Sequence, residues 1–138
     1  MQLTTKTEYS VRALVVLSES RESLKSINQI CQIQNLPKKY VEQLFRKLKK
    51  HGIIASIPGS KGGYYLTVPA KEVALGSIMA IVENHPYETS CERNKMDFEY
   101  CNVTNCSYKE LWHEIYGNIK GYLATISLED IKKRIDKE

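Results

Sequence analysis

The sequence predicts a mainly α-helical chain with one small β-hairpin, in which a winged helix-turn-helix is followed by a long helix. Three observations predict this fold. Three helical patterns follow one another in the first fifty residues, two β-like runs then flank a glycine-rich turn at 58–63, and a helical pattern of about twenty residues occupies much of the second half. We expect two segments, 1–72 and 73–138, within one integrated domain.

The first two helices are expected over about residues 5–20 and from residue 27 onward. Ser26, followed by Gln29 three residues later, is typical of a capping box at a helix start. Apolar side chains recur at helical spacing in both helices, at Tyr9, Ala13, Val16 and Leu17 and then at Ile27, Ile30 and Cys31. Cys31 is in register with the apolar face, which indicates a small buried hydrophobe.

Pro37 is placed to open a third helix, and Gly52 is placed to end it. Its apolar stripe consists of Tyr40, Val41, Leu44 and Leu48. The opposite face is largely basic and carries Lys38, Lys39, Glu42, Gln43, Arg46 and Lys49. Two helices joined by a short turn, the second of them basic, are typical of a helix-turn-helix whose second helix enters the DNA major groove.

A hairpin is expected from the β-like runs at 53–57 and 64–68, with Ser60 and Lys61 at its tip. The order of three helices and a hairpin is that of a winged helix. A glycine-rich tip lets the backbone approach a phosphate or the minor groove without a clash at Cβ. The alternative is an ordinary hairpin, which any small α+β domain can carry.

The charge is unevenly distributed along the chain. The whole sequence has 20 basic and 16 acidic residues, but residues 1–72 hold 12 and 5 of them, a net charge of +7. Residues 73–138 hold 8 and 11, a net charge of −3. This division of charge indicates that the first segment binds a polyanion such as a nucleic acid. The alternative is that its basic residues lie on an ordinary solvent-exposed surface and bind nothing.

Glu42 and Gln43 are candidates for reading bases, because a carboxylate accepts from cytosine N4 and an amide pairs with adenine. The alternative for Glu42 is an ion pair with Arg46 one helical turn away. The full set of expected DNA contacts is Lys38, Lys39, Tyr40, Glu42, Gln43, Arg46, Ser60 and Lys61. In this set the lysines and the arginine suit phosphates.

After a short apolar helix over about 75–82, the chain becomes polar and contains Cys91, Cys101 and Cys106. Thiolates hold iron–sulfur clusters and zinc, and three within sixteen residues can converge on one site. Unligated thiols, or a redox disulfide between Cys101 and Cys106, are the alternatives. Three thiolates leave a two-iron cluster or a zinc ion one ligand short. The candidates for the fourth ligand are His113, Glu8 and water.

A long helix is expected from Ser107 to about Ile126. One apolar stripe consists of Leu111, Ile115, Ile119, Tyr122, Leu123 and Ile126, and Trp112 with Tyr116 forms a second. We expect one stripe to face the core and the other to face a second copy, which makes a homodimer. A last short helix, capped by Ser127 and Asp130, ends in Lys132, Lys133 and Arg134.

Several classes are excluded by the composition. No apolar run is long enough for a membrane span, and four cysteines are too few for a disulfide scaffold. The first ten residues do not have the pattern of a secretory signal, so we expect a cytoplasmic protein. No nucleophile with a neighbouring base, nucleotide loop or carboxylate pair stands out, so we expect no enzyme.

Five groups of residues occur in a characteristic order. They are Met1-Gln2-Leu3-Thr4 with Glu8-Tyr9, then Tyr40-Val41-Glu42-Gln43-Leu44-Phe45, the tip from Gly59 to Gly63 with Tyr64, the three cysteines, and Leu111-Trp112. In this order and spacing the chain resembles, over nearly its whole length, the bacterial winged-helix iron–sulfur transcriptional regulators of the IscR/NsrR/RirA/CymR family.

The resemblance implies a homodimer that binds an imperfect palindrome in double-stranded DNA, as a repressor or an activator. It also implies an iron–sulfur cluster on Cys91, Cys101 and Cys106, which we expect to be [2Fe–2S], with [4Fe–4S] as the alternative. Lys109 stands where some members have a ligating histidine, whereas Glu8 matches an acidic ligand supplied by the other subunit in others. We therefore expect Glu8 of the partner subunit as the fourth ligand.

Two further positions depart from the family pattern. A minor-groove arginine of some members aligns with Pro58, so Lys61 is expected to take its role, and the gap between the first two cysteines is longer. Two other classes stay open. One is a cofactor-free, CymR-like regulator that responds to a metabolite or a partner protein, and the other is a zinc-stabilised DNA-binding module.

Overall fold

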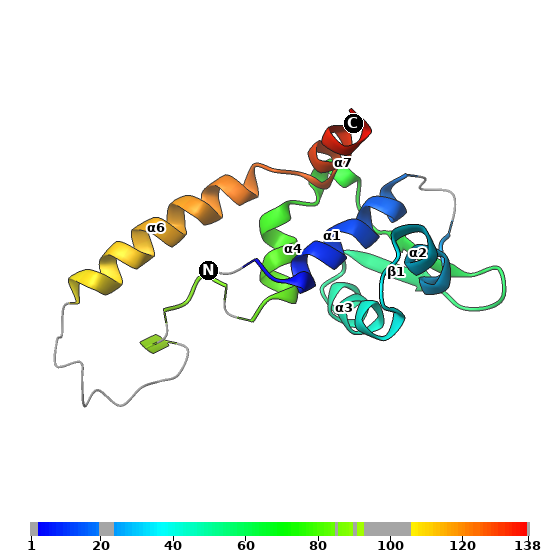
Figure 1. Ribbon diagram of the computed structural model, residues 1–138, viewed down its shortest axis with the longest axis horizontal. Helices are drawn as coiled ribbons and strands as arrows, with labels where there is room; N and C mark the ends of the chain where they lie inside the picture. The colour runs from blue at the N-terminus through cyan, green and yellow to red at the C-terminus, as the bar shows by residue number, and fades with distance from the viewer. Residues whose placement is uncertain (1–2, 20–23, 85, 90, 93–105, 138) are drawn as a thin grey trace.

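The computed structural model describes residues 3–19, 24–84, 86–89, 91–92 and 106–137, and it shows a mainly helical chain with one hairpin (Figure 1). The elements are α1 (Thr5–Ser18), α2 (Ile27–Gln34), α3 (Lys38–Lys50), β1 (Ile54–Ile57), β2 (Gly63–Leu66), the 3-10 helix η1 (Ala70–Glu72), α4 (Leu75–Val82), α6 (Ser107–Ala124) and α7 (Leu128–Asp136). None of the helices in this described part is both long and apolar enough to cross a membrane.

The helix ends follow local chemistry. Ser26 and Gln29 form the expected capping box at the start of α2, and Ser127 and Asp130 form another at the start of α7. Asn35 ends α2 in the left-handed conformation, with φ 53°. The long helix ends at Ala124, two residues earlier than expected, because the Ile126 carbonyl accepts a 2.8 Å hydrogen bond from the Leu75 amide instead of continuing the helix.

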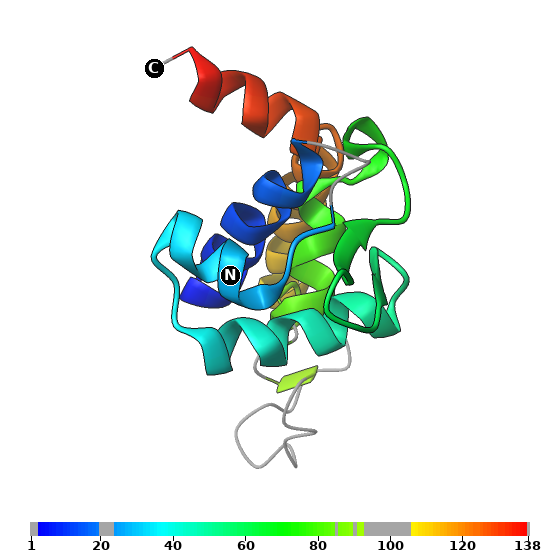
Figure 2. The same cartoon turned by 90° about the vertical axis from the view of Figure 1, so that its right-hand side faces the viewer.

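The hydrophobic core surrounds α1, which has neighbours on every side (Figure 2). Five consecutive residues of this helix, 13–17, are buried. Side chains from both segments of the chain meet there, because Leu48 of α3, Ile78 of α4 and Leu128 of α7 are all fully buried in the same cluster. The core therefore fixes α3 and the start of α7 relative to α1.

The hairpin is held close to the helices. β1 and β2 pair antiparallel, and Tyr64 of β2 also exchanges two backbone hydrogen bonds with Lys25, just before α2. Lys49 of α3 donates a 2.7 Å hydrogen bond to the Ser56 hydroxyl of β1. At Gly62 a Cβ atom would lie 1.9 Å from the Ile57 carbonyl oxygen, so this end of the turn requires glycine.

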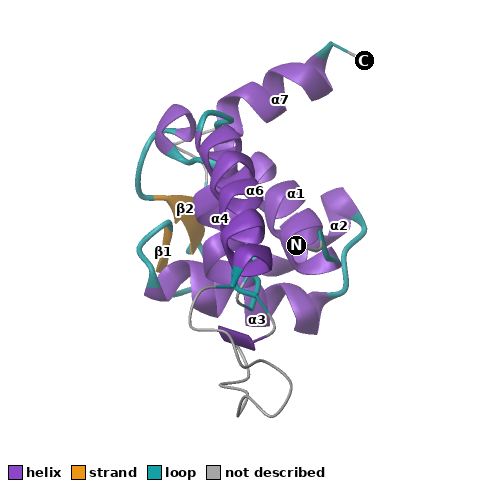
Figure 3. Ribbon diagram, turned by 90° about the vertical axis from the view of Figure 1, so that its left-hand side faces the viewer, coloured by secondary structure: helices purple, strands orange, loops and turns teal. Residues whose placement is uncertain are grey.

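Helix α6 extends away from the core (Figure 1), and in the view from its free end it lies in front of α4 (Figure 3). None of its side chains is buried. Among the helices it packs mainly against α4, and Tyr116, Ile119 and Leu123 are half-buried. These three residues come from both apolar stripes. The expectation that one whole stripe faces the core and the other faces a second copy was therefore too simple.

Glu83 joins two elements that are far apart in sequence. It follows directly after α4, is only 8% exposed, and accepts three hydrogen bonds at Oε1 from residues at the start of α1. The Thr4 hydroxyl lies 2.5 Å away, the Thr7 hydroxyl 2.8 Å and the Thr4 amide 3.3 Å. Burial raises the pKa of this carboxyl, but the hydrogen bonds from Thr4 and Thr7 together outweigh it and leave the pKa below its usual value.

Replacing Glu83 by Gln is expected to remove part of the acid sensitivity of the fold. A carboxyl with a lowered folded-state pKa stabilises fully above its unfolded-state pKa of 4.5, and this contribution disappears as the pH falls through the folded-state value. Urea denaturation at about pH 7 should show a loss of about 1 kcal/mol in the variant, and this difference should shrink in a second measurement at acidic pH, where the carboxyl becomes protonated in the folded state.

The matched control is Glu72→Gln, which changes an exposed carboxyl on η1. We expect its free energy of unfolding to follow the wild type at both pH values. A difference between Glu83→Gln and wild type that stays constant with pH would contradict the role of the charged carboxylate.

Candidate nucleic-acid interface and cysteine segment

Helix α3 presents its charged face to solvent. Lys38, Lys39, Gln43 and Arg46 are exposed, while Tyr40 and Glu42 are half-buried. The opposite face is anchored in the core by Val41, Leu44, Phe45 and Leu48, which are all buried. The sequence pattern thus gave the correct faces of this helix.

A groove of about 350 Å³ separates the start of α3 from the hairpin. Lys38 and Glu42 line it from α3, Asn28 lines it from α2, and Ser56, Gly59 and Tyr64 line it from the hairpin. Ser60 and Lys61 lie at the exposed tip, away from this groove. The candidate contacts therefore fall into two sets, one on α3 beside the groove and one at the hairpin tip.

Glu42 does not pair with Arg46. Among the ion pairs of the described residues, none joins these two side chains, so the intrahelical alternative is not the arrangement found.

Burial raises the pKa of the nearby Cys31 thiol, with an opposing effect from Lys38 and a smaller raising effect from Glu42. Cys31 is 9% exposed and belongs to the core, as its register in the sequence predicted.

Thr5, Tyr9 and Arg12 of α1 contact the two helices of the helix-turn-helix, α2 and α3. The Tyr9 ring packs edge-on against Tyr40 with centroids 5.6 Å apart, and the Thr5 and Tyr40 hydroxyls are 3.4 Å apart. Arg12 lies over the Tyr9 ring and donates to Gln34 at the end of α2. Sequence analysis missed this row, although its spacing of four and three residues places Thr5, Tyr9 and Arg12 on one helix face.

The cysteine segment, residues 84–106, carries the three candidate cysteine ligands, and two of these ligands are described. Cys91 and Cys106 are half-buried free thiols, and Cys106 is the residue from which α6 begins. The Thr89 hydroxyl lies 3.1 Å from the Cys91 sulfur. Cys101 lies outside the described residues, and the described part of the chain holds no group of three metal-binding side chains.

Glu92 links the turn at Cys91 to the first half of α6. Its carboxylate lies 3.4 Å from the Lys109 ammonium and 2.9 Å from His113 Nε2. It also accepts 3.0 Å hydrogen bonds from the amide and hydroxyl of Thr89. These Thr89 bonds, together with His113, lower the pKa of Glu92 to about 2. Sequence analysis missed this residue, whose partners on α6 lie 17 and 21 positions away.

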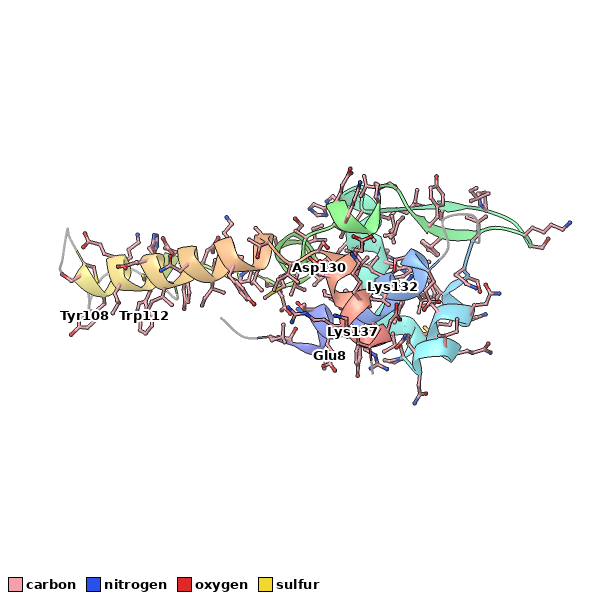
Figure 4. The ribbon with its side chains drawn as sticks, turned by 90° about the horizontal axis from the view of Figure 1, so that it is seen from above. Glu8, Tyr108, Trp112, Asp130, Lys132 and Lys137 are labelled. Carbon is pink, nitrogen blue, oxygen red and sulfur yellow. The ribbon has the colours of Figure 1, made fainter. Side chains whose placement is uncertain are left out.

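The two protein candidates for a fourth ligand have different surroundings. His113 is engaged by Glu92, whereas Glu8 is exposed in the first turn of α1. Figure 4 shows Glu8 well separated, along the length of the molecule, from Tyr108 and Trp112 at the start of α6. Within one chain, the Glu8 carboxylate therefore does not reach the start of α6.

Comparison with known proteins places this geometry in a family. The family model described as "Rrf2: Iron-dependent Transcriptional regulator" matches residues 3–134. The regulator IscR of Photobacterium profundum is 33% identical over 134 residues, which cover 96% of this chain and 76% of that protein. IscR of Vibrio atlanticus is 34% identical with the same coverage. These relatives are transcriptional regulators, not enzymes.

Solved structures agree with this result. T. potens IscR superposes with a TM-score of 0.75 and 27% identity, covering all of this chain and 89% of that one. CymR, described as the global cysteine regulator of B. subtilis, gives a TM-score of 0.78 and 27% identity, covering 97% of this chain and 98% of that one. The chain therefore belongs to the Rrf2 family of winged-helix transcriptional regulators.

Proposed function

We propose that this regulator is a cytoplasmic homodimer that senses iron–sulfur cluster status, redox state or nitric oxide through a cluster held by three cysteines. Its DNA-binding surface is the exposed basic face of α3 together with the hairpin. The observation that best supports a sensory role for the cysteine segment is the Glu92 link. It ties the turn that carries Cys91 to α6, the helix that begins after Cys106.

For DNA recognition we propose that α3 enters the major groove and that the hairpin tip contacts the adjacent backbone or minor groove. Glu42 lines the groove beside the hairpin without a salt-bridge partner among the described residues, which suits a role in accepting from a base. The exposed cations of α3 suit phosphates. The contacts proposed are Lys38, Lys39, Tyr40, Glu42, Gln43, Arg46, Ser60 and Lys61.

For dimerisation we propose that α6 packs against the same helix of a second copy. Exposed apolar side chains occur along it, at Tyr108, Leu111, Trp112, Ile115 and Tyr122. A contiguous stripe of this kind on a protruding helix is typical of a surface covered by a partner. A symmetric pair would present two α3 helices to a palindrome in double-stranded DNA.

For the cluster we propose Cys91, Cys101 and Cys106 as ligands, with Glu8 of the partner subunit in the fourth position. Thiolates suit iron, and the described Cys91 and Cys106 are free and partly accessible. Lys109 and His113 are occupied by Glu92, which favours Glu8. A bound [2Fe–2S] or [4Fe–4S] cluster would supply iron that reacts with oxidants and nitric oxide.

A cofactor-free regulator is the second candidate, because CymR is as similar in fold to this chain as T. potens IscR is. Such a regulator would respond to a metabolite or a partner protein. A zinc-stabilised module is the third. Metal and sulfide content separates all three classes.

Glu42→Ala is expected to relax DNA specificity at one base pair by about 1–3 kcal/mol, because a carboxylate that reads a base discriminates by this amount. Lys39→Ala should weaken binding to all sequences alike. It should also reduce the slope of log binding constant against log salt concentration by about one. Both effects can be measured by fluorescence anisotropy on a duplex selected from a random library and on its single-base variants. Lys71→Ala, on η1, is the control. Unchanged base preferences in Glu42→Ala would assign base reading to other residues.

Leu111→Asp is expected to convert the dimer to a monomer, since the buried charge would face an apolar partner helix. Sedimentation equilibrium measures the change. Ala124→Asp adds the same charge about 140° around α6, at 100° per residue, and should leave the dimer intact. Equal dissociation constants for Leu111→Asp and wild type would exclude this stripe as the interface.

Anaerobic purification from iron-replete cells should yield a coloured protein with iron and acid-labile sulfide in equal amounts. Cys91→Ser and Cys106→Ser should lose both, whereas Cys31→Ala, which changes the core thiol, should retain them. Glu8→Ala should shift the visible spectrum and Glu19→Ala, at the other end of α1, should not. A colourless wild type with zinc, or with no metal, would favour one of the other two classes.

A further inference from the structure

We propose that Glu83 is a positioning residue that couples the cysteine segment to the DNA-reading helix by anchoring the first turn of α1. The proposal rests on the proposed DNA-binding surface and deepens it. It assigns the route by which a change around Cys91 reaches α3.

The first step is the place of Glu83 in the chain. It directly follows Val82, the last core residue of α4, is itself only 8% exposed, and immediately precedes the cysteine segment. A displacement of the chain that follows it therefore acts directly on a carboxylate that is fixed by three hydrogen bonds.

The second step is what these hydrogen bonds hold. Thr4 is the N-cap of α1, and its hydroxyl accepts from the Lys6 amide while it donates to Glu83. Thr7, one turn later, is 2% exposed and donates to the same carboxylate oxygen. The negative charge of the Glu83 carboxylate also lies at the N-terminus of α1, which is the positive end of that helix's dipole. Glu83 thus fixes both the position and the capping of the first turn.

The third step runs across α1. Thr4 and Thr7 point toward Glu83, while Thr5 and Tyr9 contact Tyr40 in the first turn of α3. The first two turns of α1 are therefore held between two residues. One is Glu83, which precedes the cysteine segment, and the other is Tyr40, which lies beside the DNA-facing Lys39 on α3. A helical turn is too stiff to move on one side only, so a shift at Glu83 reaches Tyr40.

Coupling between two sites is reciprocal, and this supplies a test that needs no cluster. If a change in the cysteine segment alters α3, then DNA bound to α3 must alter the cysteine segment. The readout is the rate at which N-ethylmaleimide alkylates Cys91 and Cys106 in the reduced, metal-free dimer, measured by peptide mass spectrometry. Rates are compared without DNA and with a saturating duplex selected from a random library by the wild type.

In the wild type we expect the duplex to change these rates about fivefold, the lower end of typical coupling between sites. In Glu83→Gln and Thr7→Val the ratio should approach one while the duplex still binds. Thr7→Ser restores the hydroxyl and should restore the wild-type ratio, which loss of packing alone would not explain. Glu72→Gln is the control for removal of a carboxyl charge.

Two outcomes overturn the proposal. Rates in the wild type that do not respond to a bound duplex exclude coupling, yet they leave DNA binding and the cluster intact. A wild-type ratio in both folded variants, Glu83→Gln and Thr7→Val, shows that DNA affects the cysteines by another route, such as direct shielding. Failure of the proposed function looks different, because the wild type would then select no duplex or contain no iron.

Discussion

The packing around α1 is the constraint on which the rest of this structure depends. Five consecutive buried residues make more than one full turn of this helix, so its second half must be covered on every side. The helices α2, α3, α4 and α7, together with β2, all contact it. As a result, the DNA-facing helix α3 and the helix α4 that leads to the cysteines are both held against one element, and they also contact each other directly.

Local signals explain why much of the fold was predictable. The capping box at Ser26, the proline before α3 and the glycine after it mark helix ends through contacts within a few residues, and the structure confirms each of them. Glu83 and Glu92 gave no such signal. Their partners lie 76 to 79 and up to 21 positions away, and periodicity carries no information about a polar side chain that pairs across the fold. The base-reading, dimer and cluster assignments stay predictions.

The two acidic residues that the sequence did not reveal have related roles, Glu83 just before the cysteine segment and Glu92 within it. Glu83 fixes its beginning to α1, and Glu92 fixes the turn at Cys91 to α6. Glu83 is buried and accepts from hydroxyls, so salt affects it little, whereas Glu92 uses exposed cations and is open to screening. One attachment is therefore firm and the other adjustable, an arrangement that suits a segment proposed to respond to its surroundings.

The burial of Leu128 against the same core as α1 has a consequence for biosynthesis. Helix α1 has more buried residues than any other described helix, and α7, the last helix of the structure, supplies part of its cover. Until residue 128 has been translated and released from the exit tunnel, α1 lacks that cover, so the nascent chain carries an incomplete core up to that point. A chain that ends before α7 leaves this surface of α1 exposed.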